Sequence, residues 1–190
     1  RSLIDSLGNK TDKLRAYMFM GDGYYDQYQF QKAYENYEEA LDQDPDTLQY
    51  YDIKYSMAWC DYFLNRIGEG LEKLEDLADD DIYFDSLAPL RLAIARGYEW
   101  EGDMEGAIAT YEKVTEENAQ TNAAAIAYYE LGLIYQYEFE YLEQAREYYQ
   151  EARDERSGSP IHEDATRRAS KLGLLEQYTS EEELEIYPDS

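Results

Sequence analysis

The sequence predicts an all-α fold, a solenoid of antiparallel helix pairs, on three observations. Small residues recur at a constant spacing of 37, at Gly21, Ala58, Ala95 and Gly132. Apolar residues between them fall three and four positions apart, which is the period of one helix face. The apolar runs are separated by turn-forming residues such as Pro45. A unit of this length is one helix pair, which cannot bury its apolar face alone, so neighbouring pairs must stack.

A second helix in each unit is indicated by a later series of small residues, each followed four positions on by Tyr or Leu. The small residues are Ala33, Gly70, Ala107 and Ala145, and their followers are Tyr37, Leu74, Tyr111 and Tyr149. After a lead-in at 1–12, we expect four units at 13–47, 48–84, 85–120 and 121–157. Their helices are expected at 13–27, 30–43, 48–64, 67–78, 87–100, 103–117, 121–137 and 141–155.

After Pro160 the pattern predicts a capping helix within 158–177 and an acidic tail at 178–190. The apolar stripe of the cap is narrow and consists of Ala165, Ala169, Leu172 and Leu175. The basic residues at 167, 168 and 171 lie off this stripe, as the polar outer face of a solenoid end requires. Because residues 176–190 include six acidic residues and no basic one, we expect a flexible tail with a short helix at 180–186.

The repeat pattern resembles that of a known family. The first unit carries Tyr17-x2-Met20-Gly21-x2-Tyr24, then Ala33-x3-Tyr37, then Pro45, which is similar to the tetratricopeptide repeat. The fourth unit matches nearly as well, with one extra residue in its internal turn. The third has Arg91 in place of the leading aromatic, and the second has Lys54 and Asp61 where aromatics are expected. The resemblance covers residues 14–157 and implies a right-handed superhelix of the tetratricopeptide type that binds other proteins.

Composition excludes several classes of partner. The chain has 190 residues, of which 43 are acidic and 17 basic, for a net charge of −26. Such a charge repels a phosphate backbone or an anionic membrane surface, so nucleic acid is not an expected partner. No apolar run reaches the roughly 18 residues of a membrane span, which predicts no direct membrane insertion. The chain starts at Arg1 without a signal-peptide pattern, so we expect a soluble piece of a longer protein, cytoplasmic or periplasmic.

Signals for chemistry are scarce. The sequence has no glycine-rich phosphate loop and no nucleophile or zinc-protease motif, and it predicts neither a cofactor nor a metal site. His162 is expected to be an ordinary exposed side chain, and Cys60 a small buried apolar one. The run at 79–81, three aspartates, lacks the spacing of a calcium loop. We therefore expect no enzyme; a closed pocket with clustered, perturbed carboxylates would argue otherwise.

The resemblance implies that the first helix of each unit lines a concave groove. The positions that share this face are Met18, Asp22 and Tyr25, then Tyr55, Trp59, Tyr62 and Phe63, then Leu92, Arg96, Glu99 and Trp100, then Tyr129, Leu133, Gln136 and Tyr137. Family members that clamp a C-terminal carboxylate have Lys and Asn at these positions. This chain has other residues there, so a carboxylate clamp is not expected. An aromatic groove in an acidic surface favours a peptide or helix that carries Lys or Arg.

Alternatives remain open at this point. Tyr is abundant, so some groove aromatics are equally consistent with packing between units. The chain also fits an assembly segment of a larger complex, for example in a bacterial cell envelope, and self-association through its C-terminal stretch. The acidic surface suits either solvation in high salt or attraction of a basic partner.

Overall fold

A computed structural model describes residue 4 and residues 8–186, and every regular element in that part of the chain is a helix. The elements are α1 (Lys10–Asp26), α2 (Phe30–Leu41), α3 (Thr47–Phe63), α4 (Ile67–Ala78), the 3-10 helix η1 (Asp81–Ser86), α5 (Leu87–Glu101), α6 (Met104–Glu117), α7 (Asn122–Tyr137), α8 (Leu142–Glu155) and α9 (His162–Ile186). The first eight α-helices begin and end within three residues of the predicted bounds. The all-α prediction is therefore confirmed.

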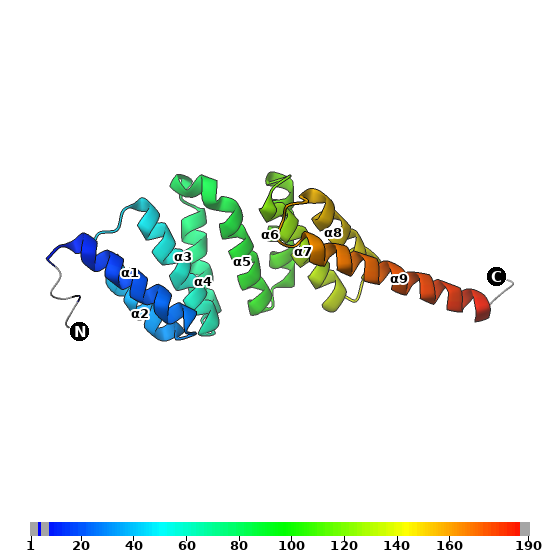
Figure 1. Cartoon of the computed structure of the whole chain (residues 1–190), viewed down its shortest axis with the longest axis horizontal. Helices are drawn as coiled ribbons and strands as arrows, with labels where there is room; N and C mark the ends of the chain where they lie inside the picture. Colours follow the sequence, from blue (N-terminus) through cyan, green and yellow to red (C-terminus); the bar gives the residue numbers. More distant parts are fainter. Residues whose placement is uncertain (1–3, 5–7, 187–190) are drawn as a thin grey trace. The chain divides into compact units, whose positions relative to one another are not determined.

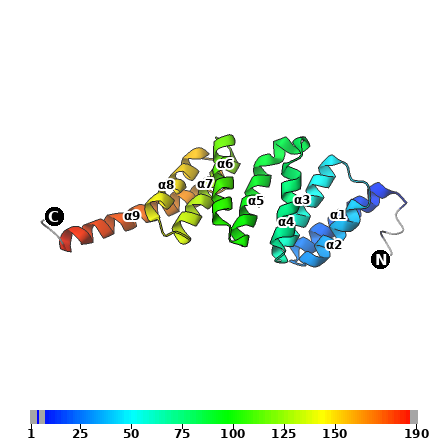
Figure 2. The same cartoon turned by 180° about the vertical axis from the view of Figure 1, so that it is seen from behind.

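The chain divides into two compact units, unit 1 at residues 1–107 and unit 2 at residues 108–190, so that the boundary falls within α6. In unit 1, helices α1 to α5 each pack against the next in chain order. In unit 2, α8 packs against both α7 and α9. Figures 1 and 2 show these neighbours side by side from opposite directions. This is the stacking of helix pairs that the repeat predicts.

The turns inside the helix pairs repeat one backbone conformation. A residue with positive φ follows the first helix at Tyr28, Asn65, Gly102 and Glu140. The first three lie 37 residues apart and the last 38, so the extra residue predicted in the fourth turn is present. Only Gly102 is a glycine, whose missing Cβ makes this conformation easy. Side chains cap the starts of α1, α3 and α7, most completely at Asp46, which forms a capping box with Gln49.

Small residues let an aromatic ring from the second helix lie against the first. A Cβ built at Gly21 would lie 2.5 Å from the Tyr37 ring, and one at Gly132 would lie 2.6 Å from Tyr149. Both tyrosines are buried. The Tyr37 hydroxyl donates to the Asp22 carboxylate at 2.8 Å. The close helix approach inferred from the spacing is thus filled by these rings.

In the second helix pair, α3 and α4, the ring that fills the space between the helices comes from the first helix of the pair. Leu74 stands where the other units have Tyr, and Tyr62 of α3 fills the space instead. The Tyr62 ring lies against Gly70 of α4, and its hydroxyl lies against Gly97 of α5 and donates to the Ala93 carbonyl at 3.2 Å. The aromatic therefore comes from the first helix, and the glycines that make room for it come from its neighbours.

Asp61 occupies a buried position where an aromatic was expected, and it is fully shielded from solvent. Its carboxylate lies 2.7 Å from Arg66 and 2.8 Å from Lys73. The Arg66 guanidinium also lies over the Tyr34 ring. Burial opposes the charge on Lys73, but hydrogen bonding to Asp61 and its negative charge outweigh this and raise the pKa of Lys73. Asp61, one of the positions at which the helix pair α3–α4 departs from the repeat pattern, is therefore the centre of a buried ionic cluster.

Helix α9 continues the repeat as the first helix of a fifth unit. Ala169 lies 37 residues after Gly132, and together with Leu172 it is buried against Ala145 and Tyr149 of α8. The helix runs to Ile186, nine residues past the predicted end of the cap, because no Pro occurs before position 188 to stop it. The backbone is helical as far as residue 186, which includes the stretch 180–186 where a short helix was expected in the tail, and residues 187–190 lie outside the described part.

The buried tyrosines predict how stability depends on pH. Burial raises the pKa of Tyr37, of Tyr62 and of Tyr149, the last despite the opposing charge of Arg168. A raised pKa favours the neutral ring in the folded state, so this stability is complete below the ordinary value near 10. It is lost as pH rises above 10, because the unfolded chain ionises first.

We therefore expect the urea midpoint to be constant from pH 7 to about 9.5 and to fall steeply above about 10.5. Tyr62→Phe should flatten this fall, whereas Tyr28→Phe, which changes an exposed ring, should not. Denaturation followed by circular dichroism measures both. Equal slopes in the two variants would contradict the proposed cause.

Candidate functional site

The groove positions of unit 1 bring aromatic rings from α1, α3 and α5 together. The Trp59 ring centroid lies 6.1 Å from that of Trp100 and 6.1 Å from that of Phe63. Tyr25 of α1 meets Phe63 at 6.0 Å. Phe63 and Trp100 are about half exposed, at 46% and 45%. We call Tyr25, Tyr55, Trp59, Phe63 and Trp100 the aromatic surface of unit 1.

Phe30 was not identified from the sequence, although its ring stacks on Phe63 at 4.4 Å. It is the first residue of α2, outside the face that the groove spacing follows. Tyr62 has only 3% of its surface exposed and belongs to the core, so its ring does not reach a partner. Met18 is half-buried and packs beside the core of the first helix pair. Arg96 and Glu99 are half-buried on α5.

A pocket of about 330 Å³ opens beside the aromatic surface, between the first helix pair and α3. Aromatic rings and oxygen atoms line it, from Asp22, Tyr25, Asp26, Tyr37, Tyr55, Ser56 and Trp59. None of these residues is basic. Burial, followed by the negative charges of Asp22 and Asp46, raises the pKa of the neighbouring Asp52. The pocket therefore has the negative potential and the ring faces that favour a cation.

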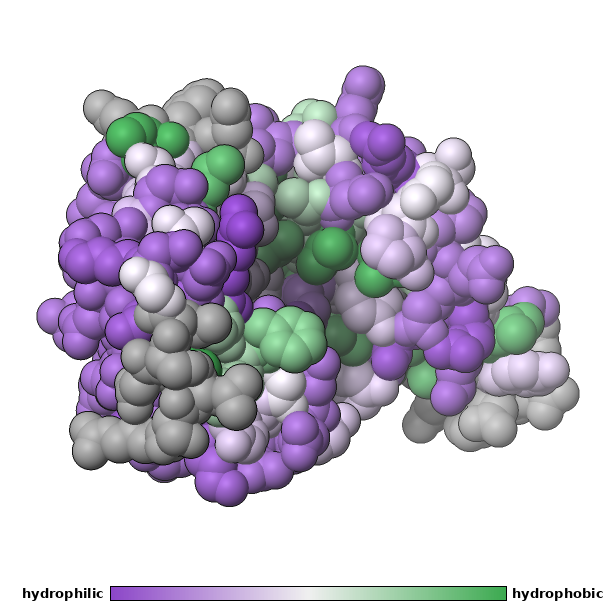
Figure 3. All heavy atoms as spheres, turned by 60° about the vertical axis from the view of Figure 1, so that its left-hand side comes forward, coloured by the Kyte–Doolittle hydropathy of each residue, from purple (hydrophilic) through white to green (hydrophobic). Residues whose placement is uncertain are grey.

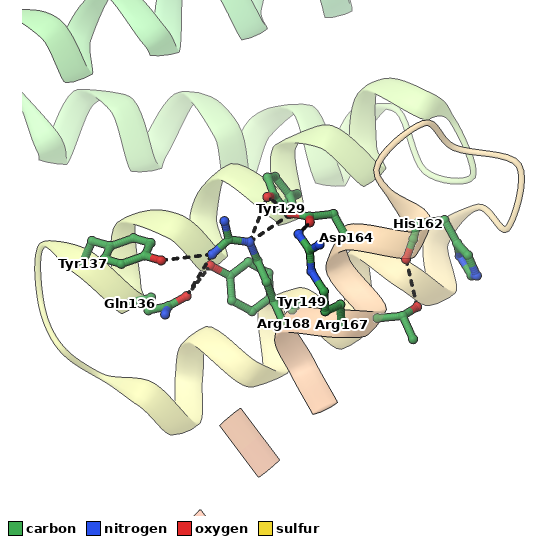
Figure 4. Close-up of polar contacts among 9 residues, drawn as sticks. Tyr129, Gln136, Tyr137, Tyr149, His162, Asp164, Arg167 and Arg168 are labelled. Carbon is green, nitrogen blue, oxygen red and sulfur yellow. Dashed lines mark hydrogen bonds and ion pairs between the residues drawn. The ribbon is translucent and has the colours of Figure 1, made fainter. Parts of the chain in front are cut away.

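In unit 2, the groove positions converge on a cation that the chain itself supplies (Figure 4). Arg168 of α9 donates from Nε to the Tyr129 hydroxyl at 2.9 Å, and from Nη1 to the Tyr137 hydroxyl at 3.1 Å. Its guanidinium carbon lies 5.6 Å from the ring centre of Tyr129 and 5.7 Å from that of Tyr149. Arg168 was expected off the apolar stripe, but it points into the protein because these oxygens and ring faces stabilise its charge.

Two further acceptors, Asp164 and Gln136, complete the hydrogen bonds of the cluster formed by Arg168, Tyr129, Tyr137 and Tyr149, which we call the Arg168 cluster. Asp164, one helical turn earlier in α9, accepts from Arg168 Nε at 3.0 Å. Gln136, another groove position, accepts from the Tyr149 hydroxyl at 2.8 Å. Burial opposes the Arg168 charge, but the Tyr137 and Tyr129 hydroxyls outweigh it and raise the pKa of Arg168. Leu133, the last groove position, is half-buried beside the same cluster.

Cys60 and His162, the side chains considered for catalysis or metal binding, both pack against the protein. Cys60 is buried as expected, and burial, together with the Asp61 charge, raises the pKa of its thiol to about 12. His162 is half-buried, and its Nδ1 lies 2.9 Å from the Arg153 carbonyl oxygen. Within residues 8–186, no three His, Cys, Asp or Glu side chains gather in a way that could hold a metal. Nor is any helix there both long and apolar enough to cross a membrane.

The surface around these sites is strongly polar. Figure 3 shows hydrophilic residues, in purple, over most of the visible face, with apolar residues, in green, in smaller patches. This agrees with the net charge of −26. Within the aromatic surface of unit 1, Phe63 and Trp100 are large apolar side chains that remain about half exposed.

The repeat pattern of one family matches residues 14–47, which include most of α1 and all of α2. The family is described as the tetratricopeptide repeat. Residues 14–47 therefore form a tetratricopeptide repeat. The resemblance noted in the sequence is thereby confirmed, and so is the fold. Proteins with these repeats are generally interaction scaffolds rather than enzymes.

Solved structures share the tetratricopeptide fold at low sequence identity. BtubC from P. vanneervenii is 18% identical with a TM-score of 0.64, over 85% of this chain and 71% of that one. A Podosopora anserina putative kinesin light chain with nearly identical repeats is 17% identical with a TM-score of 0.64, over 92% of each chain. The Rap conjugation gene regulator of plasmid pLS20, in complex with the Phr* peptide, is 18% identical with a TM-score of 0.65.

The match to the Rap regulator covers 90% of this chain but only 52% of the other, so this chain spans about half of that protein. No protein with a curated function is similar in sequence. At these identities the likeness concerns the fold alone. Tetratricopeptide repeats act as protein-protein interaction modules, and this is the level at which the comparisons support a function.

Proposed function

We propose that this protein is a non-enzymatic binding module that holds a peptide or helix carrying Lys or Arg on the aromatic surface of unit 1. The observation that carries the proposal is the pocket beside that surface. It joins the rings of Tyr25, Tyr55 and Trp59 to the carboxylates of Asp22 and Asp26. A cation seated there would meet ring faces and negative charge together.

The Arg168 cluster of unit 2 supports this chemistry. Two helix pairs after Tyr55 in the repeat, Tyr129 and Tyr137 of α7 and Tyr149 of α8 place three rings around the Arg168 guanidinium, and the first two also accept hydrogen bonds from it. The repeat therefore accommodates an arginine on this face when its neighbours supply oxygen acceptors. In unit 1 the acceptors are carboxylates, which bind a cation more strongly than hydroxyls do. The Rap conjugation gene regulator, which shares the fold and was solved in complex with the Phr* peptide, supports peptide binding as the general mode.

The proposal predicts which peptides bind. In a displayed library of random twelve-residue peptides, selection on the wild-type protein should enrich Lys or Arg next to an apolar residue. Synthetic versions of the enriched peptides can then be measured by fluorescence anisotropy. Trp59→Ala with Phe63→Ala should weaken their binding by more than about tenfold, because two large contact surfaces are lost.

Matched variants separate the site from general effects. Phe19→Ala removes an aromatic ring of α1 that is highly exposed and does not line this pocket, and it should leave peptide affinity unchanged. Asp26→Asn should weaken cationic peptides and reduce the salt dependence of their binding. Peptides that bind wild type and the double variant equally would overturn the proposal, as would a library that yields no basic peptides.

A further inference from the structure

The pocket beside the aromatic surface of unit 1 occupies the place in the repeat that the Arg168 side chain fills in unit 2. Three side chains that contact Arg168 (Figure 4) each have a counterpart three repeats earlier in the chain. The contacts are Gln136, Tyr137 and Tyr149, and the counterparts are Tyr25, Asp26 and Tyr37. All three counterparts line the pocket of unit 1. The two places are therefore equivalent in the repeat.

Unit 1 supplies no cation of its own to this pocket. The residue that corresponds to Arg168 is Met57, whose side chain is buried in the core between the first helix pair and α3. None of the residues that line the pocket is basic. The place that the chain's own arginine fills in unit 2 is therefore open in unit 1 to a cation from a partner.

Both places combine ring faces with oxygen atoms, but the rings come from different helices. In unit 2 the three rings belong to α7 and α8, and α9 has small side chains at positions 166 and 170. The corresponding residues of α3 are Tyr55 and Trp59, whose rings line the pocket of unit 1. Helix α1 adds the Asp26 carboxylate at the position of the Tyr137 hydroxyl.

The oxygen atoms of the pocket are placed to accept several hydrogen bonds. The Tyr37 hydroxyl donates its proton to one oxygen of Asp22 at 2.8 Å, so the hydroxyl lone pairs and the second Asp22 oxygen can still accept. No donor in the described part of the chain bonds to the Asp26 carboxylate. Two carboxylates with an available oxygen each suit a ligand group that carries several donors.

We propose that this pocket selects arginine over lysine, which rests on the proposed function and names the side chain that the partner inserts. A guanidinium is planar and carries five N–H donors, so it can lie on a ring face while it donates to oxygen atoms around the ring. A lysine ammonium is a compact, strongly hydrated point charge with three donors. Rings and carboxylates together therefore fit arginine better.

The chain's own cations agree with this preference. In the described part of the chain, each lysine that lies over an aromatic ring lies over one ring only; these are Lys32, Lys54 and Lys73. The Arg168 guanidinium carbon lies 5.6 to 5.9 Å from the centres of three rings and also donates to the Tyr129 and Tyr137 hydroxyls. An arginine in the pocket of unit 1 would use the same combination of contacts.

The test uses three small probes with different side-chain head groups: the N-acetyl amides of arginine, of lysine and of citrulline, a neutral analogue of arginine. Each is titrated into the whole wild-type chain, and the indole N–H signal of Trp59 is followed by NMR. The chain has two tryptophans, so Trp100→Phe identifies which of the two signals belongs to Trp59. Trp59 lines the pocket, and its signal therefore reports occupancy.

The arginine probe should bind with a dissociation constant of roughly 1 to 10 mM, because a single side chain makes few contacts. The lysine probe should bind about fivefold more weakly or less, and the citrulline probe should not bind up to about 100 mM, because it lacks the charge. Asp26→Asn should weaken the arginine probe by about threefold or more. Glu39→Gln removes the same charge from α2 outside this pocket and should change nothing. Circular dichroism checks that both variants are folded.

Contrary outcomes separate this inference from the proposed function. A lysine probe that binds as tightly as the arginine probe overturns the preference for arginine but leaves the proposed function standing. Equal binding of the citrulline probe, an unchanged Trp59 signal up to about 100 mM arginine probe, or equal weakening by Asp26→Asn and Glu39→Gln also overturns the inference. The peptide library judges the proposed function independently, because it reports binding to the whole aromatic surface of unit 1.

Discussion

Replacing Gly21 with leucine is expected to lower the free energy of unfolding by about 3 kcal/mol, at the upper end of what overpacking costs. The physical reason is the Tyr37 ring, which a Cβ at this position would meet at 2.5 Å. That ring is buried and its hydroxyl is bound to Asp22, so it cannot move aside without breaking this contact. Urea denaturation followed by circular dichroism measures the loss.

A matched pair of alanine variants in the same helix isolates the cause. Gly21→Ala should destabilise the protein, although alanine is the better helix former, because its methyl group overlaps the Tyr37 ring. Gly23→Ala should stabilise it by up to about 1 kcal/mol, because nothing lies within 4 Å of a Cβ there. Two changes of the same sign would show that helix propensity dominates, and would contradict the assigned packing.

Replacing Asp61 with asparagine is expected to cost about 3 kcal/mol of folding free energy. The carboxylate is fully buried and lies within 2.8 Å of both Arg66 and Lys73. Its loss leaves two cations, each largely shielded from water, without their shared counter-charge. The pKa of Lys73, raised by its contacts with Asp61, should fall toward or below its ordinary value in the variant.

Asp52 on the same helix provides the control. Its pKa is raised by burial and by the negative charges of Asp22 and Asp46, so its charge is unfavourable in the fold. Asp52→Asn should therefore be neutral or slightly stabilising at pH 7, by at most a few tenths of a kcal/mol. Urea denaturation of the two variants under the same conditions distinguishes the roles of these aspartates. Asp61→Asn as stable as wild type would show that the ionic cluster adds nothing to stability.

The sequence alone predicted the helices because their signals are local. Helix bounds depend on a three-to-four period of apolar residues and on turn residues next to them, and both can be read within one helix pair. The constant spacing of Gly21, Ala58, Ala95 and Gly132 also predicted the repeat. The aromatic surface of unit 1 was predicted for the same reason, since Tyr55, Trp59 and Phe63 share a face of one helix.

Other features depended on contacts between residues far apart in the chain. The helical spacing places both Tyr62 and Trp59 on the predicted groove face. Glycines in α4 and α5, however, make room for the Tyr62 ring in the core. Arg168 is basic and looked like a surface residue, yet three oxygen acceptors and three rings from other helices, together with Asp164 of α9, hold it against unit 2. Asp61 weakened the family match because an aromatic residue is expected at its position. Its counter-charges, Arg66 and Lys73, come from the following turn and helix, so its burial could not be predicted from its own helix.

The sequence by itself determined the helix pairs, their period and the acidic surface of this protein, since each follows from neighbours along one helix. Only the tertiary structure decided which aromatic side chains face solvent and which charges are buried. A side chain is buried or exposed according to the space and the partners that other helices provide, and no local period records these.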